Sequence, residues 1–239
     1  MSLVKLIAQA DERGLAASGL ACLDRCLPPL SGDPDVLRPL WAGAAAGAAK
    51  WPERLAEARE AVDAVIAAES APELDAVAAA PLGESAAVPG SGPGGAESGR
   101  PPSKGVTLAL VRTMLANAPA GWDPEPLRAW ADTCSVVALE IHQKLDTVGE
   151  SGSAAAAEWL TRCREDPAAV ADAVEGAERG DGVGPLVAGE LRRQIAILEL
   201  LSDTTGPAAA GALHRAMALS TEGQRVLRAV VSRRARARS

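Results

Sequence analysis

The chain has 239 residues, a formal net charge of −7 and a sequence pI near 5.0, so its surface is unfavourable for binding nucleic acid over the whole protein. An apolar content of 48% is enough for a packed core, but the chain contains 52 alanines and neither phenylalanine nor tyrosine. Alanine is the best helix former, whereas sheets depend on β-branched and aromatic residues, which are scarce here apart from valine. The composition therefore excludes a β-rich fold and predicts an all-α helical bundle.

Residues 1–80 are predicted to form an N-terminal helical hairpin or three-helix unit. Apolar residues at helical spacing give one stripe up to Gly14 and a second over 15–27, and Gly14 and Gly19 permit a bend between or within these helices. Proline in the first turn followed by an acid marks three further starts, at 33–35, 51–53 and 71–73.

Residues 81–105 differ from the rest of the chain in composition. Proline, glycine and serine dominate, Val88 is nearly alone as a larger apolar residue, and the charges cancel. Such a segment cannot bury enough apolar surface to offset the entropy lost on ordering. We therefore expect a flexible, disordered linker between the N-terminal segment and a larger C-terminal bundle.

The C-terminal bundle, residues 106–239, is predicted to contain about six helices. The segment 185–201 is apolar around much of its circumference, so we expect it to be the central core helix. Two separate helices are expected after it, with a break at 219–221, because Thr221 and Gln224 have the spacing of a capping box.

The candidates for metal binding or nucleophilic chemistry are four cysteines and two histidines. Cys22 and Cys26 lie four residues apart on one helical face, and cysteine is a common small core residue, so we expect both to be buried packing residues. The alternatives are a redox pair after distortion or half of a metal site, since zinc needs four ligands. His142 lies two residues after Glu140, a spacing that directs the side chains apart, and we place it at the surface or boundary. No catalytic, cofactor-binding or metal-ligating residue is assigned, and the role of the cysteine pair stays open.

The C-terminal residues 225–239 carry the clearest functional pattern, six arginines without an acid beside an apolar face of valine and leucine. The candidate interaction residues are Arg225, Arg228, Arg233, Arg234, Arg236 and Arg238. A basic amphipathic helix can bind an acidic protein surface, nucleic acid or an anionic membrane. Alternatively, its arginines are solvated and favour the end of the helix dipole. Trp122, just before the Asp123 cap, is a further candidate as an interface anchor.

The N-terminus lacks the charged start and apolar run of a signal peptide, and no run is long and apolar enough to span a membrane. We therefore expect a cytoplasmic protein with reduced cysteines. Arginine outnumbers lysine twenty to four and there is one asparagine, which indicates a GC-rich bacterial genome. The preference for arginine is thus not by itself evidence for phosphate recognition.

These patterns predict a non-catalytic protein that acts through protein–protein interaction, as an adaptor, a regulator or an assembly factor. The alternative is a protein that binds an anionic surface, nucleic acid or membrane, through the arginine-rich C-terminal helix. An enzyme ranks third, because a bundle can hold a site that no local motif reveals, and no cofactor is predicted. We favour packing of the two helical parts against each other, since the alanine-rich segment 1–80 makes a thin core alone.

Overall fold

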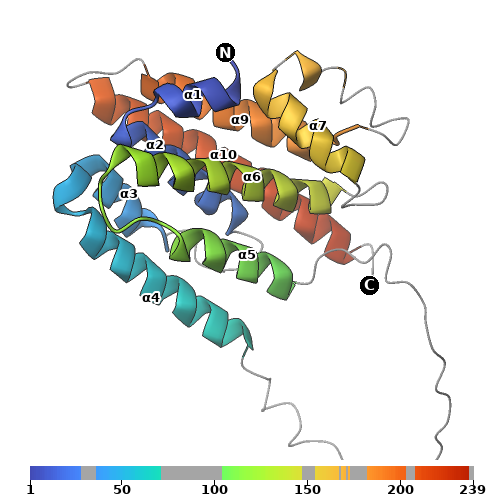
Figure 1. Cartoon of the computed structure of the whole chain (residues 1–239). Helices are drawn as coiled ribbons and strands as arrows, with labels where there is room; N and C mark the ends of the chain where they lie inside the picture. Colours follow the sequence, from blue (N-terminus) through green and yellow to red (C-terminus); the bar gives the residue numbers. More distant parts are fainter. Residues whose placement is uncertain are drawn as a thin grey trace, which may run out of the picture.

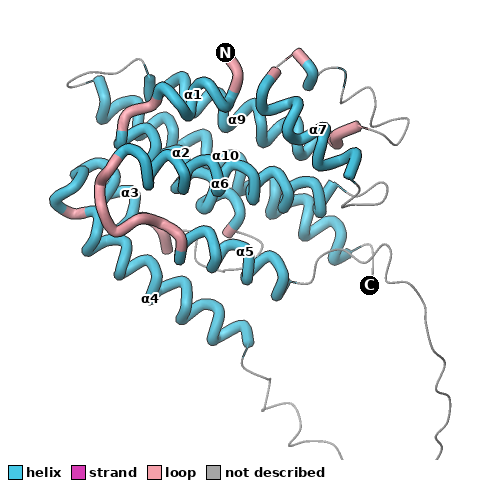
Figure 2. Tube along the Cα trace, in the orientation of Figure 1, coloured by secondary structure: helices cyan, strands magenta, loops and turns pink. Residues whose placement is uncertain are grey.

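Figure 1 shows the arrangement of α-helices in the computed structural model of the chain. The structure describes residues 1–27, 36–70, 104–146, 154–166, 168–170, 172, 182–202 and 208–236. These residues form helices and connecting turns and no strand, which confirms the predicted all-α fold class (Figure 2). The described elements are α1 (Leu3–Gln9), α2 (Glu12–Cys26), α3 (Arg38–Ala46), the short 3-10 helix η1 (Gly47–Ala49), α4 (Trp51–Ser70), α5 (Lys104–Ala116), α6 (Pro124–Asp146), α7 (Ala154–Glu165), α9 (Pro185–Ser202) and α10 (Ala208–Arg236).

Proline lies in the first turn of several helices. α4 begins at Trp51, within the predicted start at 51–53, and α6 begins at Pro124, directly after the Asp123 cap. α9 also begins at a proline, and its first free amides are capped by a side chain from another helix. Asp146, the last residue of α6, accepts hydrogen bonds from the backbone amides of Leu186 and Val187, each at 3.0 Å. Asp146 at the end of α6 therefore caps the start of α9, a contact that the sequence near either helix end does not predict.

Some predicted segments lie outside the described residues. They are the helix starts at 33–35 and 71–73 and most of the linker at 81–105. Lys104 and Gly105, predicted to end the linker, already belong to α5.

The central helix of the described fold is α2, and the prediction that 185–201 would be central was wrong. Every residue of α2 from Gly14 to Cys26 is buried, and α2 contacts α3, α5, α6, α9 and α10. By contrast, α9 leaves Arg192 and Glu199 exposed and buries one face. The physical reason is side-chain size, because glycine, alanine and serine along α2 let neighbouring helices approach it from every side. Helices of the N-terminal and C-terminal segments thereby share one apolar core.

Gly19 is a packing position and not a bend. A Cβ atom at Gly19 would lie 2.7 Å from the nearest atom of the Trp130 ring, so only glycine lets α6 bring its indole against α2. The chain bends earlier, at Ala10 and Asp11, where the Asp11 carboxylate caps α2 by accepting from the Gly14 amide at 2.7 Å. The expectation of a bend at the two glycines was therefore wrong.

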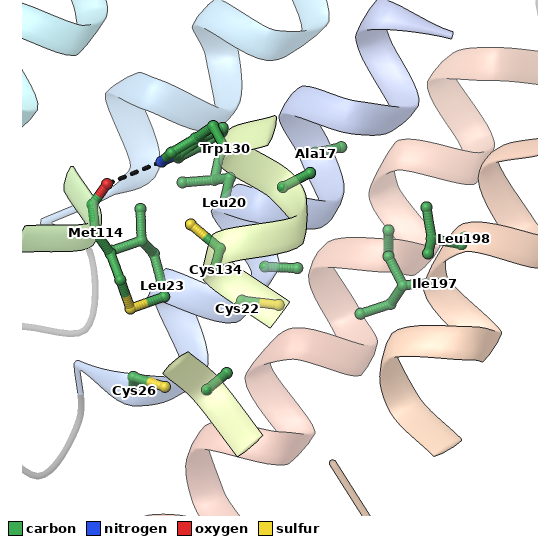
Figure 3. Close-up of a cluster of buried hydrophobic side chains, with 14 of the residues drawn as sticks. Ala17, Leu20, Cys22, Leu23, Cys26, Met114, Trp130, Cys134, Ile197 and Leu198 are labelled. Carbon is green, nitrogen blue, oxygen red and sulfur yellow. Dashed lines mark hydrogen bonds between the residues drawn. The ribbon is translucent and has the colours of Figure 1, made fainter. Parts of the chain in front are cut away.

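Tryptophans fasten the long connection between α5 and α6 to the core. The Trp51 ring makes edge-to-face contacts with Trp122 and Trp130, with ring centroids 5.3 and 5.8 Å apart. The Trp51 Nε1–H donates to the Pro119 carbonyl at 2.7 Å, and the Trp130 Nε1–H donates to the Met114 carbonyl at 2.8 Å (Figure 3). In a chain without phenylalanine or tyrosine, these indoles supply both volume and polar anchoring.

α10 is one continuous helix from Ala208 to Arg236, so the predicted break at 219–221 was wrong. The residues taken for a capping box have tertiary or intrahelical partners. Gln224 donates to the Asp24 main-chain carbonyl at 2.9 Å, and the Thr221 hydroxyl donates to the Met217 carbonyl one turn earlier at 3.0 Å. The spacing alone does not distinguish a cap from an interior turn that packs against a neighbour.

Candidate functional site

Two consecutive residues of α2, Asp24 and Arg25, belong to two different polar sites, and both residues lie near α10. Arg25 belongs to a buried pair with Glu190 of α9. Asp24 lies at the base of an open cleft between α2, α3 and α10. We call the first site the buried pair and the second the basic cleft. The basic cleft is lined by Asp24, Arg38, Trp41, Met217, Thr221, Gln224, Arg225 and Arg228.

The buried pair is a two-pronged ion pair closed off from solvent. The Arg25 Nε and Nη2 atoms donate to Glu190 Oε2 and Oε1 at 2.8 and 2.6 Å, and both side chains are 0% exposed. Gln194 Nε2 donates to Glu190 Oε1 at 2.9 Å, and the Ser135 hydroxyl donates to Gln194 Oε1 at 2.6 Å. Burial alone would raise the pKa of Glu190, but the charge and hydrogen bonds of Arg25 hold it below its usual range.

His142 is part of this site and not a surface residue. Its Nε2 atom lies 3.5 Å from Glu190 Oε2, its Nδ1 atom lies 2.7 Å from the Ala138 carbonyl, and the residue is buried. Burial lowers the pKa of His142 against the opposing charge of Glu190. The expected boundary position was wrong because the partner of His142 is Glu190, supplied by a different helix, and not its sequence neighbour Glu140.

The cysteines near the buried pair are unsuited to nucleophilic chemistry. Burial raises the pKa of Cys22 to about 12 and raises those of Cys26 and Cys134 well above the usual value. Figure 3 shows the three sulfurs among apolar side chains of the core. Within the described ranges, no group of three or more histidine, cysteine and acidic side chains could hold a metal ion.

The buried pair has no room for a substrate. The cavity beside it, lined by Cys22, Arg25, Ser135 and Gln194 among others, measures about 10 Å³. A space of this size is at the limit for a single water molecule. The arrangement of Arg25, Glu190 and His142 therefore fixes how α2, α6 and α9 pack, and it offers no access to a reacting molecule.

The basic cleft is larger and open to solvent. Its volume is about 350 Å³, within the usual range for small-ligand sites. α3 contributes Arg38 and Trp41 to one wall, and α10 contributes Arg225 and Arg228, three residues apart, to the other. Residues at this spacing share a helix face, so the two arginines of α10 lie next to each other.

Asp24 is held at the base of the basic cleft by hydrogen bonds. Its Oδ2 atom accepts from the Ser220 hydroxyl at 2.8 Å, Gln224 Nε2 donates to its main-chain carbonyl at 2.9 Å, and the Trp41 side chain lies close enough to lower its pKa. Burial raises the pKa of Asp24 to about 6, although these hydrogen bonds and neighbouring Arg25 act in the opposite direction. The Asp24 carboxylate therefore already accepts a hydrogen bond within the chain, whereas the positively charged groups that line the cleft are arginines of α3 and α10.

The structure separates the predicted arginines into different environments. Arg225 and Arg228 are exposed and line the basic cleft. Arg233 is exposed on α10 outside the cleft. Arg234 is half-buried near Asp146, where its charge opposes the effect of burial on the Asp146 pKa. Exposed Arg236 ends α10, and Arg238 lies outside the described residues.

Trp122 is half-buried rather than fully exposed. Its ring packs edge-to-face on Trp51 and contacts the apolar core. Its role in an interface stays a prediction, but much of its surface is already covered within the chain.

Sequence reasoning missed the buried pair and one wall of the basic cleft. Arg25 and Glu190 are separated by 165 positions, so only the fold brings them together. The one local indication of the buried pair is the charge of Arg25 within a stretch of α2 made mostly of small and apolar residues, since a buried charge requires a partner. Arg38 and Trp41 carry no such indication, because each is ordinary for an amphipathic helix.

A second groove, of about 660 Å³, lies between α1 and α6. Apolar Val4 and Ile7 line one side, whereas Glu125, Arg128 and Asp132 give the other side mixed charge. Asp132 is already paired with Arg164. This groove therefore favours neither an anionic nor a cationic partner.

Comparison with protein-family models, with curated proteins and with solved structures finds no match. Among the described helices, none is long and apolar enough to cross a membrane.

Proposed function

We propose that this protein is a non-catalytic interaction protein that binds an acidic segment of a partner protein at the basic cleft and the adjoining face of α10. The observation that carries this proposal is the position of Arg225 and Arg228. Both are exposed beside a cleft to which a second helix adds Arg38, and neither forms an ion pair in the part of the chain that the structure describes. Uncompensated neighbouring cations attract an anionic partner.

Other arginines of the fold support this contrast. Arg54 pairs with Glu57, Arg112 pairs with Asp63, and Arg59 donates to carbonyls at the end of α5. These guanidinium groups are used within the chain. Arg225 and Arg228 are placed for use by another molecule.

A short acidic segment suits this surface better than a long polyanion. The chain as a whole has a net charge of −7, and its excess of positive charge is confined to residues 225–239. A nucleic acid or an anionic membrane extending past this region would meet an acidic body, whereas a short segment would not. The proposal also includes that the protein acts in the cytoplasm of a bacterial cell.

The chemistry of the cleft favours binding over catalysis. No histidine or cysteine lines the cleft. The Thr221 hydroxyl is engaged as the donor of a hydrogen bond to the Met217 carbonyl. A hydroxyl nucleophile needs a base within hydrogen-bond reach, and the buried Asp24 carboxylate is engaged by Ser220. Guanidinium groups bind anions but do not exchange protons near neutral pH.

The test uses the full chain and a fluorescein-labelled peptide rich in glutamate, with a glutamine peptide of the same length as reference. The double variant Arg225→Glu/Arg228→Glu should weaken glutamate-peptide binding about tenfold or more, because like charges then face each other. The control Arg215→Glu/Arg233→Glu makes the same charge change at exposed positions of α10 that do not line the cleft. It should change binding about threefold or less, through long-range charge alone.

Fluorescence anisotropy at two salt concentrations measures these affinities, and circular dichroism checks that each variant is folded. Equal weakening by both double variants would show attraction to net charge only and would contradict the proposed site. Tighter binding of duplex DNA or phosphatidylserine vesicles than of the glutamate peptide, lost in the same Arg225/Arg228 variant, would favour the alternative of an anionic-surface binder.

A further inference from the structure

The groove between α1 and α6 combines exposed apolar side chains with charges of both signs. The two helices contact each other (Figure 1), and the groove between them measures about 660 Å³. Val4, which lines it, leaves 39% of its surface exposed. Ala8 and Ala129 are exposed in the same groove, and such small side chains let another backbone approach closely. This surface therefore gains free energy when a second surface covers it.

Two charges of the groove have no partner in the part of the chain that the structure describes. Glu125 is exposed and forms no ion pair there, and Arg128, three residues later, forms none either. The Arg128 Nε atom is buried and has no hydrogen-bond partner among these residues, which is unfavourable for a charged group. The other acid of the groove, Asp132, is already paired with Arg164. A molecule that satisfies this surface must therefore offer one negative and one positive charge.

A second copy of the chain offers both. In a two-fold symmetric contact a surface meets itself, so Glu125 of one copy faces Arg128 of the other, and the reverse pair forms at the same time. A purely acidic or purely basic segment would instead bring a like charge to one of these two residues.

The charge of the whole chain favours the same face. Two copies that each carry a net charge of −7 repel each other on average. In the groove, the charges of Glu125 and Arg128 cancel and Asp132 is paired, so this locally neutral face opposes self-association least.

We propose that a second copy of this chain docks on the groove between α1 and α6, with Glu125 and Arg128 forming reciprocal ion pairs across a two-fold axis and Val4 packing between the copies. No residue that lines the basic cleft also lines this groove, so the dimer and the proposed function are independent of each other.

The first test changes the charges in the full chain and measures the dimer dissociation constant by sedimentation equilibrium. The wild-type chain should show a monomer–dimer equilibrium. Glu125→Arg and Arg128→Glu should each weaken the dimer about tenfold or more, because like charges then face each other across the axis. An equimolar mixture of the two variants should associate again, since each variant supplies the charge that the other lacks. This recovery also shows that both variants are folded.

Glu222→Arg and Arg233→Glu are the matched controls, because they make the same charge changes at exposed positions of α10 outside the groove. Each should alter the dissociation constant about threefold or less, through long-range charge alone. Val4→Ser should weaken the dimer about threefold or more by removing apolar contact. Val226→Ser, at a valine of α10 that is 36% exposed, should leave the dimer unchanged.

Thiol labelling of Val4→Cys with a maleimide identifies what covers the groove, because the four native cysteines are buried. In a reversible dimer, labelling should slow as the protein concentration rises. Slow labelling at every concentration would show that the groove is covered within the chain and would overturn the inference. A wild-type chain that stays monomeric overturns it too, as does a dimer that both groove charge variants leave intact or a variant mixture that fails to associate.

Discussion

The buried pair and the basic cleft begin at adjacent residues of one helix and use the same side chain, arginine, in opposite ways. Arg25 is fully enclosed, and its charge is met by Glu190 within the chain. Arg225 and Arg228 are exposed and meet no carboxylate in the described part of the chain. The difference teaches that the position of the counter-charge, and not the residue type, separates an arginine that specifies packing from one that is available for binding.

The energetics of the two sites differ for the same reason. Removing Arg25 and Glu190 from water carries a large desolvation cost, which their mutual attraction and the hydrogen bonds of Gln194 offset. Removing either partner would leave the other as an unpaired buried charge and would strongly lower the free energy of unfolding. Arg225 and Arg228 keep their hydration, so their removal should hardly affect folding.

The largest effect is expected from Arg25→Ala, which leaves Glu190 buried without its main partner. The free energy of unfolding should fall by about 3–5 kcal/mol, measured by urea denaturation. The double variant Arg25→Met/Glu190→Leu removes both charges at similar volume and should recover at least about half of that loss. A double variant no more stable than Arg25→Ala would contradict the charge-pair explanation.

A smaller, pH-dependent effect is expected from Asp24→Asn. Because burial raises the pKa of Asp24 to about 6 in the folded protein, the folded state binds a proton more readily than the unfolded state, whose pKa is near 3.8. The stability that Asp24 contributes is therefore full below the unfolded pKa and declines as the pH rises through about 6. Unfolding measured at low and neutral pH should show the variant gaining about 3 kcal/mol relative to wild type as the pH rises. A constant difference between the two proteins would contradict the raised pKa.

The smallest effect is expected from Gly223→Ala, at the point where α10 passes over the buried pair. A Cβ atom at Gly223 would overlap Arg25 Cδ and lie 3.0 Å from Arg25 Cγ, so the arginine would have to shift from Glu190. Overpacking outweighs the better helix propensity of alanine, and we expect a net loss of about 1 kcal/mol in thermal or urea unfolding.

Gly211→Ala is the matched control on the same helix, because its added Cβ would meet only the far end of Arg215 at 3.6 Å. It should stabilise the protein by about 0.5–1 kcal/mol. If both glycine variants changed stability in the same direction, the proposed contact between Gly223 and Arg25 would not govern this position.

The helical fold class follows from composition and spacing, because alanine content and the apolar period are properties of short segments. The starts of α4 and α6 are set by Trp51-Pro52 and Asp123-Pro124 for the same local reason. The identity of the central helix was missed because α2 is rich in glycine and alanine, whose packing value depends on neighbours such as Trp130.

The candidate site was predicted only in part. Arg225 and Arg228 stand out because they belong to a local run of arginines. Arg38, Trp41 and Asp24 enter the same cleft through tertiary packing of α2 and α3 against α10, which no spacing along the chain encodes. The buried pair is likewise a long-range feature.

The central position of α2 has a consequence for how the protein folds. Its residues are synthesised early, but Arg25 finds Glu190 only 165 positions later, and the Asp24 carbonyl finds Gln224 only 200 positions later. Such distant contacts slow folding, because a long loop must close before they form. During synthesis on the ribosome, α2, the most buried of the described helices, can meet α3, α5 and α6 early but lacks α9 and α10 until nearly the whole chain has emerged, and this nascent stage is where aggregation or chaperone binding should concentrate.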